Sequence, residues 1–323
     1  MLIYANSNEY DSGQMSSAVG LGTFDGLHAG HMKLIGTLTG EAKNRNLRSI
    51  LYTFTGEPDD ILKKGYHTRI LTDFDAKAEL LRKTGLDCLC VDEFTSDYAK
   101  TGAEEFVSEI LIKKLKMKLA VCGFNYTFGR FRKGDVSMLR SLKDKYGFDL
   151  IVIPPVVIND EVVSSTLIRK MIVHGEVEKA AAFLGRPYAM SGEVVKGERI
   201  GRELGFPTAN ILPHEHAAVP PYGVYITKTG LDGKSYESVT NIGVRPTIDR
   251  ISGETDKKPI IETHILKYTV PIYGKKIDVE FLKRIRSEVK FPNKEKLIQR
   301  IRIDITETEK YFADLTMNGR MLE

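Results

Sequence analysis

Short apolar segments alternate with longer amphipathic segments over the first half of the chain. The apolar segments are rich in Val, Ile and Leu, which predicts buried strands, and the segments between them have apolar residues at helical spacing. Strands joined through helices form a parallel α/β sheet, which binds ligands at the carboxyl ends of its strands. The predicted strands are 18–21, 49–54, 87–91, 119–122 and 150–153, and the predicted helices are 31–45, 68–83, 103–114 and 136–146.

From about Pro187 the pattern changes to short β-branched segments separated by turn residues. That pattern is typical of a small closed β-barrel. Apolar residues return to helical spacing over 294–312, which predicts a helix that caps the barrel. The predicted fold class is therefore α/β followed by β. The predicted barrel strands include 223–227, 235–240, 260–266 and 276–281.

The length of 323 residues exceeds that of most single domains, which agrees with this change of pattern. Two further helical segments, 167–173 and 177–184, precede the change. We therefore expect a first domain at 1–185 and a second at 186–323.

The composition is that of a globular protein that handles small anions. A net charge of +4 suits anionic small molecules but is too weak and dispersed to indicate DNA binding, so we expect no nucleic acid partner. We expect no membrane association, because no apolar run reaches the length of a span and the N-terminus lacks signal-peptide features. Three cysteines, an odd number, argue against a disulfide framework and favour the reducing cytoplasm.

The run GTFDGLHAGH at 22–31 follows the first predicted strand of the sheet and leads into a helix. His28 and His31 then fall in the first helical turn, where free N–H groups and the helix dipole favour anions. The glycines let the backbone approach a polyphosphate closely, so the loop predicts chemistry at phosphorus. Two alternatives stay open: the histidines could bind zinc, although no cysteine has finger-type spacing with them, or they could be ordinary loop residues.

Two more loops follow strands of the same sheet. The loop 123–130 mixes aromatic residues, glycine and a cation, which suit rings and phosphates. The segment 163–169 places hydroxyls at the start of a helix and Arg169 one turn later. A plain helix cap is the alternative for the hydroxyls of Ser164, Ser165 and Thr166.

A glycine-rich stretch in the second half, with Gly197, Gly201 and Arg202, precedes Thr208 and Asn210. If the chain is extended there, the Thr208 hydroxyl and the Asn210 amide oxygen lie on one face, where a hard cation could sit.

Glu262 is a carboxylate in an otherwise apolar β segment, for which an edge-strand surface charge is the alternative. The triplet Gly233-Lys234-Ser235 only imitates a phosphate-binding P-loop, because Lys228 stands where that motif needs glycine. We expect a hairpin turn there.

Seven motifs in order resemble the bacterial bifunctional riboflavin kinase and FMN adenylyltransferase family, the prokaryotic FAD synthetases, over nearly the whole chain. The motifs are GTFDGLHAGH at 22–31, GFNYTFG at 123–129, SSTLIR at 164–169, GRELGFPTAN at 201–210, NIGVRPT at 241–247, ETHIL at 262–266 and YGK at 273–275.

The resemblance implies a Rossmann-like nucleotidyltransferase sheet and a riboflavin kinase barrel. The barrel would phosphorylate riboflavin with ATP and Mg²⁺, and the sheet domain would adenylylate FMN with a second ATP. Glu262 would be the base, His28 and His31 would stabilise the phosphates and leaving pyrophosphate, and no covalent enzyme intermediate is needed. The implied site residues are, for nucleotide, Gly22, Thr23, Phe24, Asp25, Gly26, His28, Gly30, His31, Asn125, Ser164, Ser165, Thr166, Arg169, Gly197, Gly201 and Arg202; for flavin, Phe128 and Arg286; and for Mg²⁺, Thr208 and Asn210.

Two residues depart from the family's usual pattern. The family often has asparagine at the position of Thr23 and aspartate at that of Asn125, for which we expect altered affinity rather than loss of activity. A kinase-only enzyme and a flavin-sensing regulator are the alternatives, and a base and metal pair argue against the regulator. The partners expected are ATP and flavins, with the chain a monomer or weak homo-oligomer.

Overall fold

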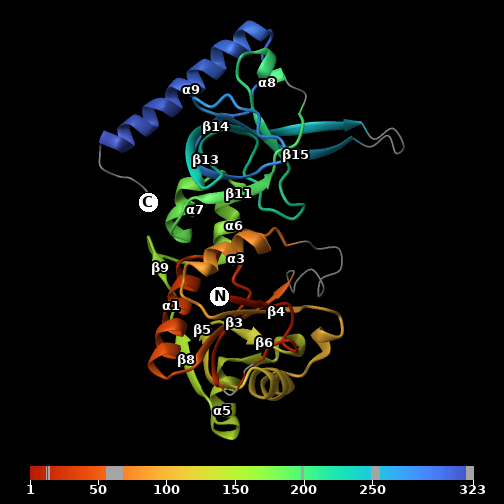
Figure 1. Ribbon diagram of the computed structural model, residues 1–323, viewed down its shortest axis with the longest axis vertical. Coiled ribbons are helices and arrows are strands. Elements are labelled where there is room, and N and C mark those ends of the chain that lie inside the picture. The colour runs from red at the N-terminus through yellow and green to blue at the C-terminus, as the bar shows by residue number, and fades with distance from the viewer. Residues whose placement is uncertain (12, 14, 56–67, 198–199, 249–254, 318–323) are drawn as a thin grey trace. The chain divides into compact units, whose positions relative to one another are not determined.

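The computed structural model describes residues 1–323 apart from 12, 14, 56–67, 198–199, 249–254 and 318–323 (Figure 1). The chain divides into two compact units, Met1–Leu167 and Ile168–Glu323. The helix α7 (Val177–Leu184) falls in the second unit, where it packs against two barrel strands, β11 and β16. The domain boundary at residue 185 stays a prediction.

A six-stranded sheet forms the centre of the first unit, with strand order β1-β4-β3-β2-β5-β8 and every neighbouring pair parallel. The predicted parallel sheet with crossover helices is confirmed, and β1 is an edge strand that the pattern did not predict. From β2 the chain adds β3 on one side and β5 on the other, so the switch point lies at the carboxyl end of β2. The strands are β1 (Leu2–Tyr4), β2 (Ser17–Leu21), β3 (Arg48–Thr55), β4 (Cys88–Glu93), β5 (Met117–Gly123) and β8 (Asp149–Ile153).

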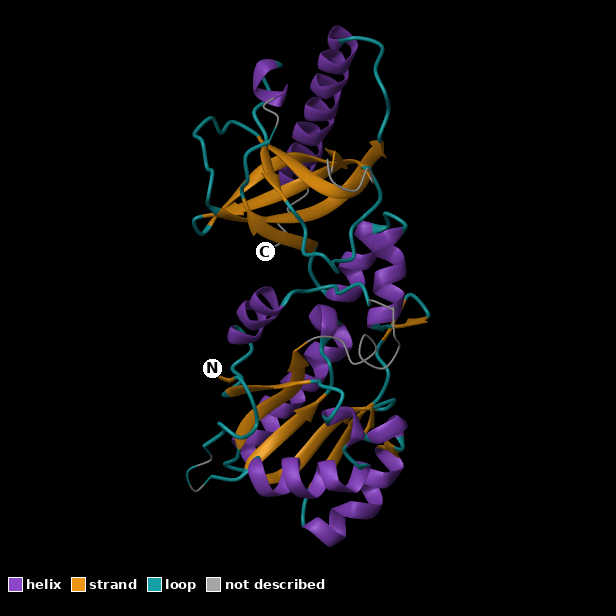
Figure 2. Cartoon of the chain, turned by 90° about the vertical axis from the view of Figure 1, so that its right-hand side faces the viewer, coloured by secondary structure: helices purple, strands orange, loops and turns teal. Residues whose placement is uncertain are grey.

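Helices cover both faces of this sheet (Figure 2). On one face α1 (Ala29–Asn44) and α3 (Phe74–Arg82) bury apolar residues such as Leu38 and Leu81. On the other, the segment 103–114 and α5 (Val136–Tyr146) do the same. Gly20 lets α1 pack closely against β2, because a Cβ there would lie 2.8 Å from Leu38 Cδ2.

Two helices of the first unit differ from their predictions. The helix α3 begins at Phe74 rather than at 68, because the Asp73 carboxylate caps it by accepting from the Ala76 N–H. The segment 103–114 is helical, but only Ala103–Glu105 (α4) is α-helical and Phe106–Lys114 is wound as a π-helix. The other elements among the described residues of the unit are the short strands β6 (Thr127–Phe128), β7 (Gly134–Asp135), β9 (Val157–Ile158) and β10 (Glu161–Val162), the start of α6 (Ser165–Val173), and three 3₁₀ turns.

A strongly curled antiparallel sheet forms the second unit, with strand order β11-β16-β13-β14-β15-β12. In the described residues its edges meet through one bridge, in which Val195 N donates to Asn210 O at 2.8 Å. The predicted barrel is confirmed as a strongly curled sheet, but the prediction that it is closed is wrong, because apart from this bridge the described edges stay open. The elements are β11 (Tyr188–Glu193), α8 (Ile200–Glu203), β12 (Ala209–Ile211), β13 (Gly223–Leu231), β14 (Lys234–Ile248), β15 (Thr255–Ile265), β16 (Lys276–Ser287) and the predicted C-terminal helix α9 (Lys294–Met317).

The P-loop look-alike is the hairpin turn between β13 and β14. Leu231 pairs with Lys234, and the two residues between them have positive φ, Asp232 at 50° and Gly233 at 73°. These angles are those of a type I′ hairpin turn.

Five buried hydroxyls form a chain across β13, β14 and β15. Thr229 and Thr227 each contact Ser238, at 2.7 and 2.8 Å between hydroxyl oxygens, and Thr227 also contacts Thr240 at 2.7 Å. Thr240 in turn contacts Thr263 at 2.9 Å. All five side chains are fully buried, so this polar chain is enclosed in the second unit.

Candidate active sites

The loop between β2 and α1 is fixed by packing of its own rings. Phe24 has a left-handed backbone, with φ of 54°, which costs a bulky residue roughly 1 kcal/mol. Its ring is buried and meets the His31 ring edge-on, with centroids 5.2 Å apart. Gly22 leaves room for that ring, because a Cβ there would lie 3.1 Å from Phe24 Cζ. The buried Phe24 ring therefore packs against the His31 ring and supports it.

His28 and His31 stack on each other at the amino end of α1. Their ring centroids are 3.6 Å apart and their planes differ by 16°. His28 caps the helix, because its Nδ1 accepts from the His31 N–H at 3.3 Å. The Nδ1 atom of His31 is buried and has no hydrogen-bond partner among the described residues. Burial, His28 and the nearby Lys77 hold the pKa of His31 well below its usual value, so its imidazole is neutral at pH 7.

Asp25 connects this loop to two other segments of the first unit. Its buried carboxylate accepts from the backbone N–H groups of Leu71, at 3.0 Å, and Thr72, at 3.1 Å. Its backbone carbonyl accepts from the Ser165 hydroxyl at 2.9 Å. Asp25 and Ser165 thus hold the opening loop and the start of α6 together.

The start of α6 combines a helix cap with side chains that can meet a ligand. The Ser164 hydroxyl accepts from Leu167 N at 3.3 Å, as a cap does. Thr166 is exposed and Arg169 is half-buried one turn further along. The segment can therefore be both a helix cap and a ligand-binding segment, since Ser164 caps the helix and its neighbours remain accessible.

The loop after β5 divides its aromatic residues between the core and the surface. Phe128 is only 7% exposed and stacks on Tyr126, with centroids 5.6 Å apart, so its ring belongs to the core. Phe124 is 47% exposed and Phe131 is 71% exposed. Asn125 is exposed beside them. In this conformation the accessible rings of the loop are those of Phe124 and Phe131.

A cavity of about 420 Å³ opens in the second unit between β12, β14, β15 and α9. Gly197, Thr208 and Asn210 line it and also line a smaller hollow of about 150 Å³. The two spaces therefore share one wall. A Cβ at Gly197 would overlap the Asn210 amide, so this wall requires glycine.

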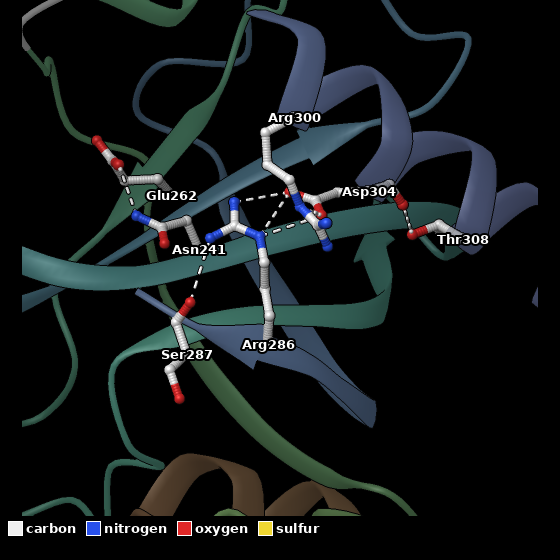
Figure 3. A network of polar contacts seen from close by, with 7 residues as sticks. All are labelled: Asn241, Glu262, Arg286, Ser287, Arg300, Asp304 and Thr308. Carbon is white, nitrogen blue, oxygen red and sulfur yellow. Dashed lines mark hydrogen bonds and ion pairs between the residues drawn. The ribbon is translucent and has the colours of Figure 1, made fainter. Parts of the chain in front are cut away.

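Glu262 lines the larger cavity. On the sheet it lies between two asparagines. Strand pairing places it opposite Asn241 on β14 and Asn210 on β12, so β15 is not an edge strand. Asn241 Nδ2 donates to Glu262 Oε2 at 3.3 Å (Figure 3). The Asn210 Oδ1 atom is buried and has no hydrogen-bond partner in the part of the chain that the structure describes.

A buried aspartate holds Arg286, which also lines the larger cavity (Figure 3). The Asp304 carboxylate, on α9, accepts from Arg286 Nε at 3.0 Å and from its Nη2 at 2.7 Å, and also from Arg300 Nε at 2.9 Å. The guanidinium also lies over the Phe291 ring, at 5.7 Å from its centroid. Arg286 therefore ties the barrel to α9 and faces the cavity at the same time.

Comparison with known proteins covers both units. A FAD synthetase family model matches residues 11–167, and a riboflavin kinase model matches residues 184–312. Two proteins named bifunctional riboflavin kinase/FMN adenylyltransferase are similar along their lengths. The one from Bacillus subtilis is 34% identical and the alignment covers 94% of each chain; the one from Escherichia coli is 32% identical over 97% of this chain and 98% of its own. The chain belongs to this family.

A solved structure bears a different name from those of the curated relatives of this bifunctional family. It is named as a macrolide-efflux protein from Streptococcus pneumoniae, has a TM-score of 0.84 and 30% identity, and aligns over 95% of this chain and 98% of its own. In this chain, no described helix combines the length and hydropathy needed to cross a bilayer.

The structure brings together most of the residues that the resemblance to the bifunctional family pointed to. In the first unit these are the 22–31 loop and Ser165, and in the second they are Gly197, Gly201, Thr208, Asn210, Glu262 and Arg286. The side chain of Arg202 lies outside the described part. The predicted roles of Asn125 and Phe128 stay predictions.

Sequence reasoning missed three side chains of these sites in this member of the family. Asn241 lies in the motif at 241–247, which by itself does not indicate a role for this amide. Asp304 and Lys77 are charged residues on buried faces of helices, at helical spacing from Thr308 and Leu81 respectively. A charge at a core position of an amphipathic helix is the signal that would have found both.

Proposed function

We propose that the second unit transfers the γ-phosphate of ATP to riboflavin and that the first unit transfers AMP from a second ATP to the resulting FMN. Family membership supports both activities. The observation that carries the residue assignment is Glu262, a carboxylate in the cavity beside the wall that the two hollows share.

In the kinase step, the larger cavity accepts the flavin and the smaller hollow the nucleotide. Glu262 takes the proton of the terminal ribityl hydroxyl as the oxygen attacks the γ-phosphorus, and ADP leaves. The Asn241 amide orients the carboxylate through its hydrogen bond. Arg286 has donors beyond those that hold Asp304 and can meet the flavin in the same cavity.

The residues of the shared wall fit Mg²⁺. The Asn210 Oδ1 atom is an enclosed acceptor without a donor among the described residues, and the Thr208 side chain lines the same two spaces. Hard divalent cations prefer such oxygen ligands. When bound, Mg²⁺ neutralises phosphate charge at the point of transfer.

In the adenylyl-transfer step, an oxygen of the FMN phosphate attacks the α-phosphorus of ATP and pyrophosphate leaves. The nucleophile is already charged, so the site needs no base. The amino end of α1 and the imidazoles of His28 and His31 face the place where charge builds up on the leaving pyrophosphate. Ser165 keeps this loop against the start of α6, where the exposed Thr166 extends the site. The nucleotide role of Arg169 stays a prediction.

One assay tests this assignment. The purified protein is incubated with riboflavin, ATP and Mg²⁺, and the flavins are separated by chromatography. FMN followed by FAD is the expected result. FMN without FAD would indicate a kinase-only enzyme, and neither product would favour a flavin-sensing regulator. The cytoplasmic location and the state of monomer or weak homo-oligomer stay predictions.

A further inference from the structure

A histidine on β15 lies two residues from Glu262 and contacts the segment that leads into the shared wall. His264 and Glu262 alternate to the same face of the strand, and both line the larger cavity. The His264 ring is half-buried, and its Nδ1 atom lies 2.8 Å from the backbone carbonyl oxygen of Pro207. A carbonyl oxygen can only accept a hydrogen bond, so Nδ1 carries the hydrogen and donates it.

This contact begins where the pairing of two strands ends. The last pair between β12 and β15 on this side is Ala209 with Thr263, so Thr208 and Pro207 lie beyond it. Proline has no N–H group, and the ladder of hydrogen bonds therefore cannot continue through Pro207 in the ordinary way. The His264 side chain supplies a contact from the same strand instead, and it fixes the carbonyl group that is bonded directly to Thr208.

The segment 206–208 is also packed closely against α8. The Phe206 N–H donates to the Gly201 carbonyl at 2.7 Å, and a Cβ at Gly201 would lie only 2.6 Å from the Phe206 carbonyl oxygen and 3.3 Å from Thr208 Oγ1. The Phe206 ring meets the His264 ring edge-on, with centroids 6.0 Å apart. The segment is therefore tied both to α8 and to β15, and His264 makes a hydrogen bond and a ring contact to it from β15.

We propose that His264 is a positioning residue of the kinase site, which holds the Pro207 carbonyl so that the Thr208 side chain keeps its place at the shared wall. This inference rests on the proposed function of the second unit. Without the hydrogen bond, the peptide between Pro207 and Thr208 can turn and move the Thr208 hydroxyl. Glu262 stays in place, because β15 is paired on both sides. His264 thus sets where the proposed Mg²⁺ ligand lies relative to the proposed base.

The test replaces the histidine by side chains that keep or lose the donor at the position of Nδ1. His264→Phe keeps a ring that can pack on Phe206 and removes the donor. The amide of asparagine ends near the position of Nδ1, whereas that of glutamine reaches the position of Nε2, so only His264→Asn keeps the donor in place. His174→Phe is the matched control, because His174 is exposed at the end of α6 and its Nδ1 also contacts a backbone carbonyl, that of Lys170, at 2.6 Å.

The expected effect is on Mg²⁺ use and turnover. In His264→Phe, half-maximal FMN formation should need about fivefold to tenfold more Mg²⁺ and kcat should fall by about tenfold, as for the loss of one positioned hydrogen bond. The riboflavin KM should stay within about twofold of wild type, because the flavin contacts are unchanged. His264→Asn should recover most of the loss, and His264→Gln should resemble His264→Phe. His174→Phe should match wild type in all three quantities.

Two measurements do not depend on turnover. Calorimetry of ADP binding with and without Mg²⁺ should show a smaller Mg²⁺-dependent gain in affinity in His264→Phe than in wild type, and His264→Asn should restore the gain. Nitrogen NMR of the wild-type protein, at a pH where the His264 ring is neutral, should show the ring hydrogen on Nδ1. Denaturant unfolding gives the stability of each variant.

The proposal is overturned by a wild-type Mg²⁺ requirement and kcat in His264→Phe, or by a neutral ring with its hydrogen on Nε2. Recovery in His264→Gln but not in His264→Asn would also overturn it, since Nε2 would then meet the substrate directly. Equal losses in all three variants that follow their losses in free energy of unfolding, or failure of all three to fold, would give His264 a structural role only. A wild-type protein that makes no FMN would instead contradict the proposed function, and the ADP-binding measurement would still decide the role of His264.

Discussion

The two candidate sites bind phosphate groups with different kinds of chemical group. In the first unit the groups offered to a ligand are a helix terminus, loop backbone and two stacked imidazoles of which one is held neutral. In the second unit they are ionic and amide side chains that project from strands, with Glu262 between two asparagines and Arg286 against Asp304. The difference follows from the nucleophile: a phosphate arrives charged, whereas a hydroxyl must lose a proton.

This contrast predicts which substitutions should inactivate each site. A site built on local backbone depends on the residues that hold the loop, so its weak points lie on other elements, such as Thr53 and Ser165. A site built on strand side chains has a rigid frame and depends on single functional groups. The substitutions below should therefore separate the two reactions, and each reaction is the control for the other.

The largest effect is expected from Glu262→Gln. Loss of a general base typically lowers a rate about 10² to 10⁴-fold, so FMN formation should fall by about a thousandfold. Conversion of supplied FMN to FAD should be unchanged. Both rates are measured by chromatography with saturating ATP. Glu215→Gln, an exposed glutamate of the same unit, is the matched control. Equal loss of both reactions would contradict the assignment of two independent sites.

The converse change is His28→Ala. Removing the ring deletes one partner of the leaving pyrophosphate and the cap of α1, so FAD formation should fall by about a hundredfold while FMN formation is spared. The exposed His174→Ala serves as control. Wild-type FAD output from His28→Ala would remove the phosphate role of the loop.

Asn210→Ala tests the metal reading of the shared wall. Without the enclosed amide oxygen, half-maximal kinase activity should need about tenfold more Mg²⁺, which corresponds to about 1.4 kcal/mol. The readout is a magnesium titration of FMN formation at fixed free ATP. If the Mg²⁺ requirement matches wild type and only the riboflavin KM changes, Asn210 belongs to the flavin side and not to the metal.

Asp304→Asn should weaken riboflavin binding by about fivefold to tenfold, with a smaller change in kcat, because Arg286 loses its charged anchor. Arg286 is partly exposed, so the accompanying loss in free energy of unfolding should be near 2 kcal/mol, below that of a fully buried pair. Asp314→Asn, exposed on the same helix, controls for charge on α9. An unchanged riboflavin KM would show that the ion pair only anchors α9.

The smallest effect concerns pH. The pKa of His31 is lowered in the folded state, so below about pH 6.5 the unfolded chain binds the proton more readily and the first unit loses stability as the pH falls. Between pH 7.5 and 5.5 the loss assigned to this group should be about 1 kcal/mol. The free energy of unfolding is measured by denaturant titration at several pH values for wild type and His31→Gln. It should fall more steeply with decreasing pH in wild type than in the variant. Identical pH dependence of the two proteins would contradict the neutral His31.

Sequence reasoning succeeded where the signal is local. The apolar spacing gave α5 at its observed bounds, whereas the roles assigned to the 22–31 loop and Glu262 stay predictions. The edge strand β1 was missed because it is three residues long and Leu2 is 58% exposed, which leaves no buried pattern to detect. The start of α3 was misplaced because the prediction overlooked the Asp73 cap and because the backbone before it is bound by Asp25, a contact across 46 residues.

The missed site residues have the same cause. Lys77 and Asp304 lie far along the chain from the groups they hold, Thr23 and Arg286, and only the fold brings each pair together. The burial of Phe128 was likewise invisible, because an aromatic residue in a loop can face either the core or a ligand. The motifs contain the residues that we propose meet the substrates, whereas the residues that hold them in place become visible only in the structure.

The buried chain of hydroxyls from Thr229 to Thr263 constrains how the sequence of the barrel can evolve. A single change of Thr240 to valine would remove the hydroxyl that Thr263 contacts and leave Thr227 with Ser238 alone, at a cost of about 1 to 3 kcal/mol. Replacing all five hydroxyl residues by apolar ones of similar shape could be nearly neutral. Related barrels should therefore keep the whole set or lose it as a set, and intermediates should be scarce.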